Sequence, residues 1–153
     1  MITEKEKKVI GGAETVLFPE VSNAPVHARI DSGARTSAIW GEAAIDETKQ
    51  LVVTFYGDKQ ITHTFSQYGK QVVASSNGHT DTRFAVKLLV VVAGRKIRAT
   101  FTIANRATQV YPVLIGRNVL RGKFVVDVKI NHGLKQAEKE RIEKLQSLIK
   151  KEE

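Results

Sequence analysis

The fold is decided by the stretch Val26-His27-Ala28-Arg29-Ile30-Asp31-Ser32-Gly33-Ala34. Apolar and polar residues alternate over residues 26–30, which is the pattern of a β-strand with one face toward the core. The strand runs directly into Asp31-Ser32-Gly33, a sequence typical of a tight turn. This pattern places a carboxylate at a strand end, on a turn that Gly33 allows to bend sharply. Backbone amides and the Ser32 hydroxyl are positioned to hold that carboxylate.

The segments on both sides of this stretch are also short, apolar or alternating, and separated by turn residues. Residues 71–74 lead into Ser75-Ser76-Asn77-Gly78, and Asn-Gly is the strongest signal for a two-residue hairpin loop. Many short strands with frequent turns predict an all-β fold, either a small barrel or a sandwich. We predict strands at residues 16–18, 26–30, 38–40, 51–56, 61–65, 71–74, 82–92, 96–103, 113–115 and 124–128. The charged start, Glu4 to Lys8, is expected to fray.

The pattern changes after residue 132. The segment 134–153 contains no proline and no glycine, and its apolar residues recur at roughly helical spacing. We therefore predict a C-terminal amphipathic helix over residues 133–153, following a β-domain over residues 10–132. Its commonest role is to pack on its own domain, and a contact with a second copy or a partner is the alternative. The apolar positions are Leu134, Ala137, Ile142, Leu145, Leu148 and Ile149.

Composition excludes several classes of protein. The 153 residues are 42% hydrophobic and 26% charged, as in ordinary globular domains, and they include no cysteine. Disulfide scaffolds, thiol catalysis and thiolate metal sites are therefore excluded. No apolar run approaches the roughly 18 residues of a membrane helix, and the start shows no signal peptide, so a cytoplasmic location without membrane contact is expected. The four histidines are scattered and no phosphate-binding loop is present, so we predict neither a metal nor a cofactor.

Positive charge is concentrated in one part of the chain. The net charge is +8, and no acidic residue lies between Asp81 and Asp127. Two interpretations remain open, a set of solvated strand positions and a surface that attracts an acidic partner. The nine cations in this interval are Arg83, Lys87, Arg95, Lys96, Arg98, Arg106, Arg117, Arg121 and Lys123.

A second motif lies 85 residues after Asp31. Leu114-Ile115-Gly116-Arg117-Asn118 resembles the apolar-apolar-Gly signature of retropepsin-type aspartic peptidases. Together with residues 28–38, 75–78 and 112–122, it resembles a small bacterial and archaeal family of retropepsin-like proteins, often named "ATP-dependent zinc protease" and associated with glutamate-ligase genes. The resemblance covers residues 10 to 130, and no residue supports the words "ATP" and "zinc".

The resemblance implies a retropepsin-like acid-protease β-barrel and a role for each motif. Asp31, Ser32 and Gly33 are implied as the catalytic loop. Ala34 and the hairpin tip at Ser75, Ser76, Asn77 and Gly78 are implied to contact substrate, the tip acting as a flap. Leu114, Ile115, Gly116, Arg117 and Asn118 are implied as structural support. Arg35 stands where viral retropepsins carry an acidic residue that holds the arginine of this segment, so Arg117 needs another partner.

The chain contains a single Asp-Ser-Gly, and this determines how many protomers an active enzyme would need. Aspartic peptidase chemistry needs two carboxylates, so an active enzyme would be a homodimer with Asp31 from each protomer. The expected substrate is a peptide or protein, and acidic or glutamate-rich peptides are one candidate class. The alternative is a non-catalytic binding module that presents a basic face to an acidic partner. A nucleic-acid binder is disfavoured, because the stretch from Arg83 to Lys123 holds only three aromatic residues, Phe84, Phe101 and Tyr111.

Overall fold

Strand formation follows the alternation of apolar side chains. In β5, Leu51, Val53 and Phe55 are fully buried, whereas Val52 and Thr54 are partly exposed. The computed structural model describes residues 6–74 and 77–152. Its elements are β1 (Lys8–Ile10), β2 (Ala13–Leu17), β3 (Val26–Ile30), β4 (Ser37–Ile45), β5 (Leu51–Phe55), β6 (Thr62–Phe65), β7 (Gly69–Ala74), β8 (Thr80–Val92), β9 (Arg95–Ala104), β10 (Val113–Ile115), α1 (Arg117–Leu120), β11 (Phe124–Val126) and α2 (Lys135–Glu152).

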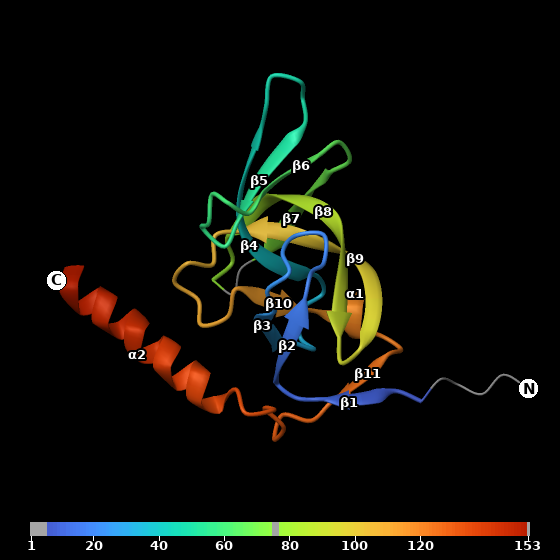
Figure 1. Cartoon of the computed structure of the whole chain (residues 1–153), viewed down its shortest axis with the longest axis vertical. Helices are drawn as coiled ribbons and strands as arrows, with labels where there is room; N and C mark the ends of the chain where they lie inside the picture. Colours follow the sequence, from blue (N-terminus) through green and yellow to red (C-terminus); the bar gives the residue numbers. More distant parts are fainter. Residues whose placement is uncertain (1–5, 75–76, 153) are drawn as a thin grey trace, which may run out of the picture.

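A closed mixed barrel forms the body of the molecule (Figure 1). The strands follow one another in the order β10-β3-β2-β8-β9-β4, and the pairing of β10 with β4 closes the ring. Two of these contacts, β10 with β3 and β4 with β9, are parallel. The β5–β6 hairpin extends the sheet from β4, and β7 pairs with β8 outside the ring. The predicted all-β class with a C-terminal helix is confirmed.

The core lies inside this ring. Phe18 and Phe101 are almost completely buried there and meet edge to face, with ring centroids 5.1 Å apart. Each large apolar side chain buried in this way stabilises the fold by about 1.5–3 kcal/mol. The barrel is thus a packed body that presents its loops, rather than its interior, to a ligand.

Two hairpin turns differ from the sequence prediction. The β8–β9 turn is a two-residue loop in which Ala93 and Gly94 both have positive φ, as a type I′ turn requires. In the β7–β8 hairpin Ala74 lies opposite Thr80, whereas a two-residue loop at Asn77-Gly78 needs a register shifted by one residue, so that predicted loop is wrong. Gly78 does adopt positive φ, at 84°. Ser75 and Ser76 lie outside the described residues.

The ends of the barrel segment also correct the prediction. Lys8 belongs to β1, which pairs in parallel with β11, whereas it was expected to fray. The last strand ends at Val126 rather than at residue 128. The Asp127 carboxylate accepts a hydrogen bond from the Lys129 N–H and turns the chain there, which leaves Val128 82% exposed.

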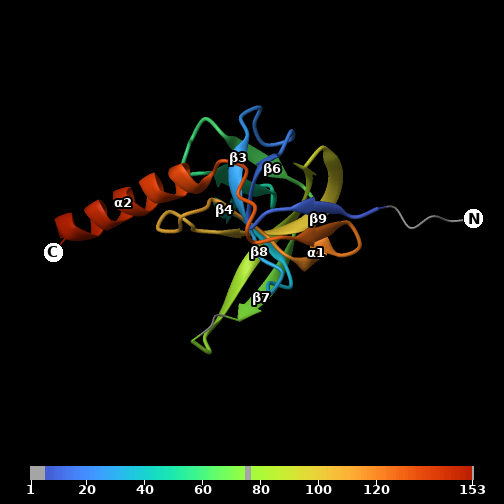
Figure 2. The same cartoon turned by 90° about the horizontal axis from the view of Figure 1, so that it is seen from below.

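The predicted C-terminal helix is present as α2, but only its start packs on the barrel. Leu134, just before the helix, is buried, whereas Ile142 and Leu148 are exposed. Figures 1 and 2 show the rest of the helix extending away from the body. Within residues 6–74 and 77–152, no helix is long and apolar enough to cross a membrane.

Candidate active site

The loop after β3 holds Asp31 through backbone contacts. The Asp31 N–H donates to the carbonyl oxygen of Ile115 at 2.8 Å, and the Gly33 N–H donates to Oδ1 of Asp31 at 2.9 Å. A Cβ on Gly33 would lie 3.2 Å from that Oδ1, so glycine provides the space for this contact. Ser32 is exposed, and in the described part of the chain no hydrogen bond joins its hydroxyl to Asp31. Asp31 is half-buried.

Strand β10 lies next to this loop and accepts a hydrogen bond from it through Ile115. It lies between β3 and β4, with Ile115 opposite Ile30 and Leu114 opposite Ala38. Gly116 follows at a point where no side chain fits, because an added Cβ would lie 2.3 Å from the carbonyl oxygen of Thr36. The apolar-apolar-Gly order is therefore required by packing.

A buried serine connects the two motifs. Ser37 is fully buried, accepts the Gly116 N–H at 2.9 Å, and donates its hydroxyl to Oδ1 of Asn118 at 2.7 Å. The Asn118 amide in turn donates to the carbonyl oxygen of Thr100 at 2.8 Å. The sequence analysis missed Ser37 as a site residue. Its available signal was a hydroxyl residue at the start of an apolar strand, directly after the Asp31 loop.

Helix α1 was also missed, and it fixes the end of the second motif. The Arg117 N–H donates to the carbonyl oxygen of Ala34 at 2.8 Å, and Val119 and Leu120 are buried. The Arg117 side chain is exposed, and it forms no ion pair with any described residue. The structure thus joins residues 31–34 to residues 114–118, while the expected acidic partner of Arg117 is not among the described contacts.

The hairpin β7–β8 lies on the same side of the barrel as the Asp31 loop. Figure 2 shows it projecting from the body beside the loop that follows β3. Asn77 and Gly78 lie at its tip, and Val72 on β7 is 70% exposed.

Three arginines lie close enough to influence one another electrostatically. Arg29 lies on β3 two residues before Asp31, Arg83 on β8, and Arg106 in the β9–β10 connection. Burial lowers the pKa of Arg106, and the nearby positive charges of Arg83 and Arg29 lower it further. The wider set of basic residues is partly used in structural contacts. Arg98 pairs with Glu20 at 3.2 Å, and Arg83 pairs with Asp81 at 3.1 Å.

The histidines with contacts in the structure serve other purposes than metal binding. Nε2 of His63 lies 2.7 Å from the carbonyl oxygen of Val21, and Nε2 of His132 lies 2.8 Å from the buried Glu14 carboxylate. Across residues 6–74 and 77–152, no three His, Asp or Glu side chains form a group able to hold a metal ion.

A closed six-stranded barrel, a carboxylate loop after one strand and an apolar-apolar-Gly strand beneath it define a retropepsin-like protein. The chain belongs to the RimB-like family, whose model, described as "Retropepsin-like aspartic endopeptidase RimB", matches residues 9–136. The sequence prediction of a retropepsin-like family and fold is confirmed.

Similar proteins include longer ones. A probable alpha-L-glutamate ligase of Desulfotalea psychrophila is 25% identical over 155 residues, covering 90% of this chain and 32% of that protein. A protein of the same name from Shewanella pealeana is 29% identical over 132 residues, covering 79% and 28%. The chain thus spans about a third of the length of these relatives. A solved Legionella pneumophila protein of unknown function has a similar fold, with a TM-score of 0.64, 20% identity, and coverage of 85% of this chain and 100% of that one.

Proposed function

We propose that the chain is one protomer of a homodimeric aspartic endopeptidase. The observation that carries the proposal is the Asp31 loop, in which Asp31 is half-buried and its carboxylate is held by the Gly33 N–H. The sequence contains one such loop, whereas the chemistry requires two carboxylates. A second copy supplies the other.

In this mechanism the two Asp31 carboxyl groups share one proton and hold a water molecule between them, because two like charges so close cannot both ionise cheaply. The ionised carboxylate accepts a proton from the water, and the water oxygen adds to the scissile carbonyl carbon. The other carboxyl group donates its proton to the carbonyl oxygen. Transfer of a proton to the amide nitrogen then breaks the C–N bond and releases an acid and an amine.

The β7–β8 hairpin acts as a flap in this proposal. Its position beside the Asp31 loop supports closure over an extended peptide (Figure 2). Closing such a hairpin excludes water from the carboxylates and strengthens their electrostatic interactions with the substrate.

The proposed substrate is an acidic, glutamate-rich peptide. Arg29, Arg83 and Arg106 support this class, because they place like charges near one another and only Arg83 is paired with a carboxylate among the described residues. Substrate carboxylates would relieve that repulsion. The similarity to probable glutamate ligases points to the same chemistry.

The second candidate is a binding module without catalysis. The same arginines favour it, since they attract an acidic partner whether or not Asp31 reacts. Cleavage separates the two candidates, because only the first produces new peptide termini.

The test compares Asp31→Asn with Asp58→Asn on a fluorescence-quenched oligoglutamate peptide. Asp58 is exposed and accepts the Gln60 N–H, a contact that asparagine keeps. We expect Asp31→Asn to abolish cleavage without dissociating the dimer, and we expect Asp58→Asn and EDTA to leave cleavage intact. Full activity in Asp31→Asn would refute the aspartic mechanism, and an active protein that sediments as a strict monomer would refute the dimer.

A further inference from the structure

The first two turns of α2 are tied to the connection between β9 and β10, residues 105–112. The Tyr111 hydroxyl donates to Oε2 of Glu138 at 2.6 Å. Nη2 of Arg141 donates to the carbonyl oxygen of Ala107 at 2.9 Å. The helix therefore contacts this connection near both of its ends.

These contacts rest on a small apolar cluster apart from the barrel core. Tyr111, Ala13 and Leu134 are each less than 10% exposed and pack together, with Val110 beside them. Burial raises the pKa of the Tyr111 hydroxyl, and the hydrogen bond to Glu138 raises it further, so the phenol keeps its proton and remains a donor. The start of α2 is thus held firmly against the connection.

The connection runs from β9, which pairs with β8 of the flap hairpin, to β10, which pairs with β3 just before the Asp31 loop. At its beginning, Asn105 and Arg83 line one cavity of about 290 Å³. At its end, the carbonyl oxygen of Pro112 accepts the Trp40 N–H, and β10 follows, whose Ile115 carbonyl accepts the Asp31 N–H. A shift of residues 105–112 would therefore displace the parts that border Asp31.

Residues 105–112 have no regular secondary structure and few contacts of their own. Nε of Arg106 donates to the Tyr111 carbonyl at 3.0 Å, and the Gln109 N–H donates to the Arg106 carbonyl at 2.9 Å. A connection of this length needs external ties to hold one conformation. The hydrogen bonds from α2 are such ties.

We propose that Glu138 and Arg141 are positioning residues of the peptidase site: through Tyr111 and Ala107 they fix residues 105–112, and with them Arg106, in the conformation that binds substrate. The inference rests on the proposed function. It gives the first turns of α2 a part in substrate binding, although no residue of α2 is placed at the reacting atoms.

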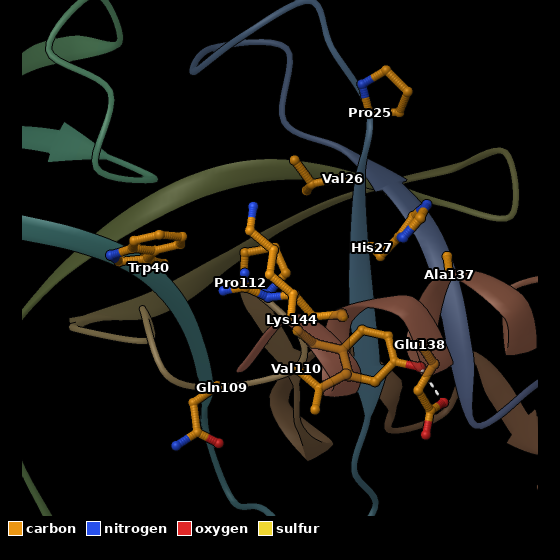
Figure 3. A pocket seen from close by; sticks show the side chains of 12 residues that line it. Pro25, Val26, His27, Trp40, Gln109, Val110, Pro112, Ala137, Glu138 and Lys144 are labelled. Atoms are coloured by element: carbon orange, nitrogen blue, oxygen red, sulfur yellow. Dashed lines mark hydrogen bonds between the residues drawn. The ribbon is translucent and has the colours of Figure 1, made fainter. Parts of the chain in front are cut away.

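Trp40 provides a fluorescence probe for the contact between α2 and the barrel. A cavity of about 530 Å³ between α2 and the barrel is lined by Trp40, Pro112, Arg141 and Lys144 (Figure 3). Trp40 is the single tryptophan of the chain, so its fluorescence responds to the docking of the helix. Figure 3 also shows the hydrogen bond made by Glu138 as a dashed line.

The test is a double-mutant cycle of Tyr111→Phe and Glu138→Ala. Both changes remove the same hydrogen bond, so the double variant should behave like each single variant. Glu138→Gln keeps an acceptor for the phenol and should restore most of the wild-type behaviour. Glu140→Ala is the matched control, because Glu140 is exposed on the same helix and bonds only Gln136 among the described residues.

We expect amide exchange in residues 105–112 to accelerate about tenfold, since a lost hydrogen bond to a charged acceptor shifts an opening equilibrium by that order. Trp40 emission should shift toward that of exposed tryptophan. The KM for the oligoglutamate peptide should rise severalfold while kcat stays within about twofold. The Glu140→Ala control should change none of these.

Two failures are distinguishable. Faster exchange with an unchanged KM, or unchanged exchange in residues 105–112, overturns the positioning proposal and leaves the peptidase intact. A wild-type protein that binds but does not cleave the peptide contradicts the proposed function. In that case the Kd for the peptide replaces the KM in the comparison, and an unchanged Kd in Glu138→Ala overturns the positioning proposal.

Discussion

Replacing Ser37 by alanine tests whether the hydroxyl beneath the Asp31 loop holds the site together. Ser37 is fully buried, and its Oγ accepts the Gly116 N–H while donating to Asn118. Alanine keeps the backbone and most of the volume but removes both hydrogen bonds. The change therefore isolates the polar connection between the two motifs from the packing around them.

The size of the effect follows from these two contacts. The buried Gly116 N–H loses its acceptor, and an unsatisfied buried donor costs about 1–3 kcal/mol. The lost bond to Asn118 costs less, about 0.5–1.5 kcal/mol, because Asn118 is exposed and water replaces the hydroxyl. The expected loss in the free energy of unfolding is about 2–4 kcal/mol, which lowers the Tm of a domain this size by roughly 6–12 °C.

Urea unfolding at fixed protein concentration, followed by Trp40 fluorescence, measures the loss. Ser66→Ala is the control, since Ser66 is exposed and makes no hydrogen bond in the described structure, and it should change the free energy of unfolding by less than about 0.5 kcal/mol. Peptide cleavage by Ser37→Ala should fall at temperatures where the protein is still folded, because the Asp31 loop is less firmly held. A midpoint equal to that of Ser66→Ala would refute the reasoning.

Further predictions concern the flap, the arginines and one surface carboxylate. Gly78→Val should lower kcat/KM with little change in Tm. Valine at φ +84° would cost about 1–3 kcal/mol, and the exposed tip can shift to relieve that strain without unfolding the barrel. Gly69→Val, with open space around it, is the neutral control, and equal losses of Tm and activity in Gly78→Val would mean a purely structural turn. Raising salt from ~0.1 to ~1 M shortens the Debye length from ~10 to ~3 Å and should weaken binding of the oligoglutamate peptide, so a salt-independent affinity would leave only solvated arginines. The pKa of Glu20 is lowered, first by the Leu89 N–H and then by Arg98, so Glu20 adds stability above the ordinary value of 4.5 that is lost as the pH falls through its folded pKa. Glu20→Gln should therefore lower the Tm at neutral pH, and the difference should shrink as the pH falls below 4.5, so a difference that stays constant on acidification would contradict this assignment.

The barrel strands could be predicted because their alternation is strong. Residues 26–30 and 113–115 match β3 and β10 without a change of boundary. The turn predictions failed where the strand register did not follow the local turn sequence. Asn77-Gly78 is a strong two-residue turn signal, yet the pairing ends at Ala74 and Thr80, while Ala93-Gly94 forms the type I′ turn.

The site was predicted less completely than the fold. The two motifs were found through the family resemblance, since nothing in their spacing brings residues 31–34 next to residues 114–118. Ser37 was missed because a single buried serine does not change the apolar alternation of its strand. Helix α1 was missed because its four residues are too few to show a helical periodicity. Arg29 was missed because it reads as an ordinary polar position of an alternating strand.

The insertion of β10 between β3 and β4 has a consequence for how the protein is made. The residues that hold Asp31 in place follow it by more than eighty positions, so the loop cannot take its final shape until that later strand has been synthesised. Because closing so long a loop is slow compared with forming a local hairpin, the carboxylate acquires its setting near the end of folding. A nascent chain would then lack the finished Asp31 loop, and with it the proposed catalytic site, until the barrel has closed.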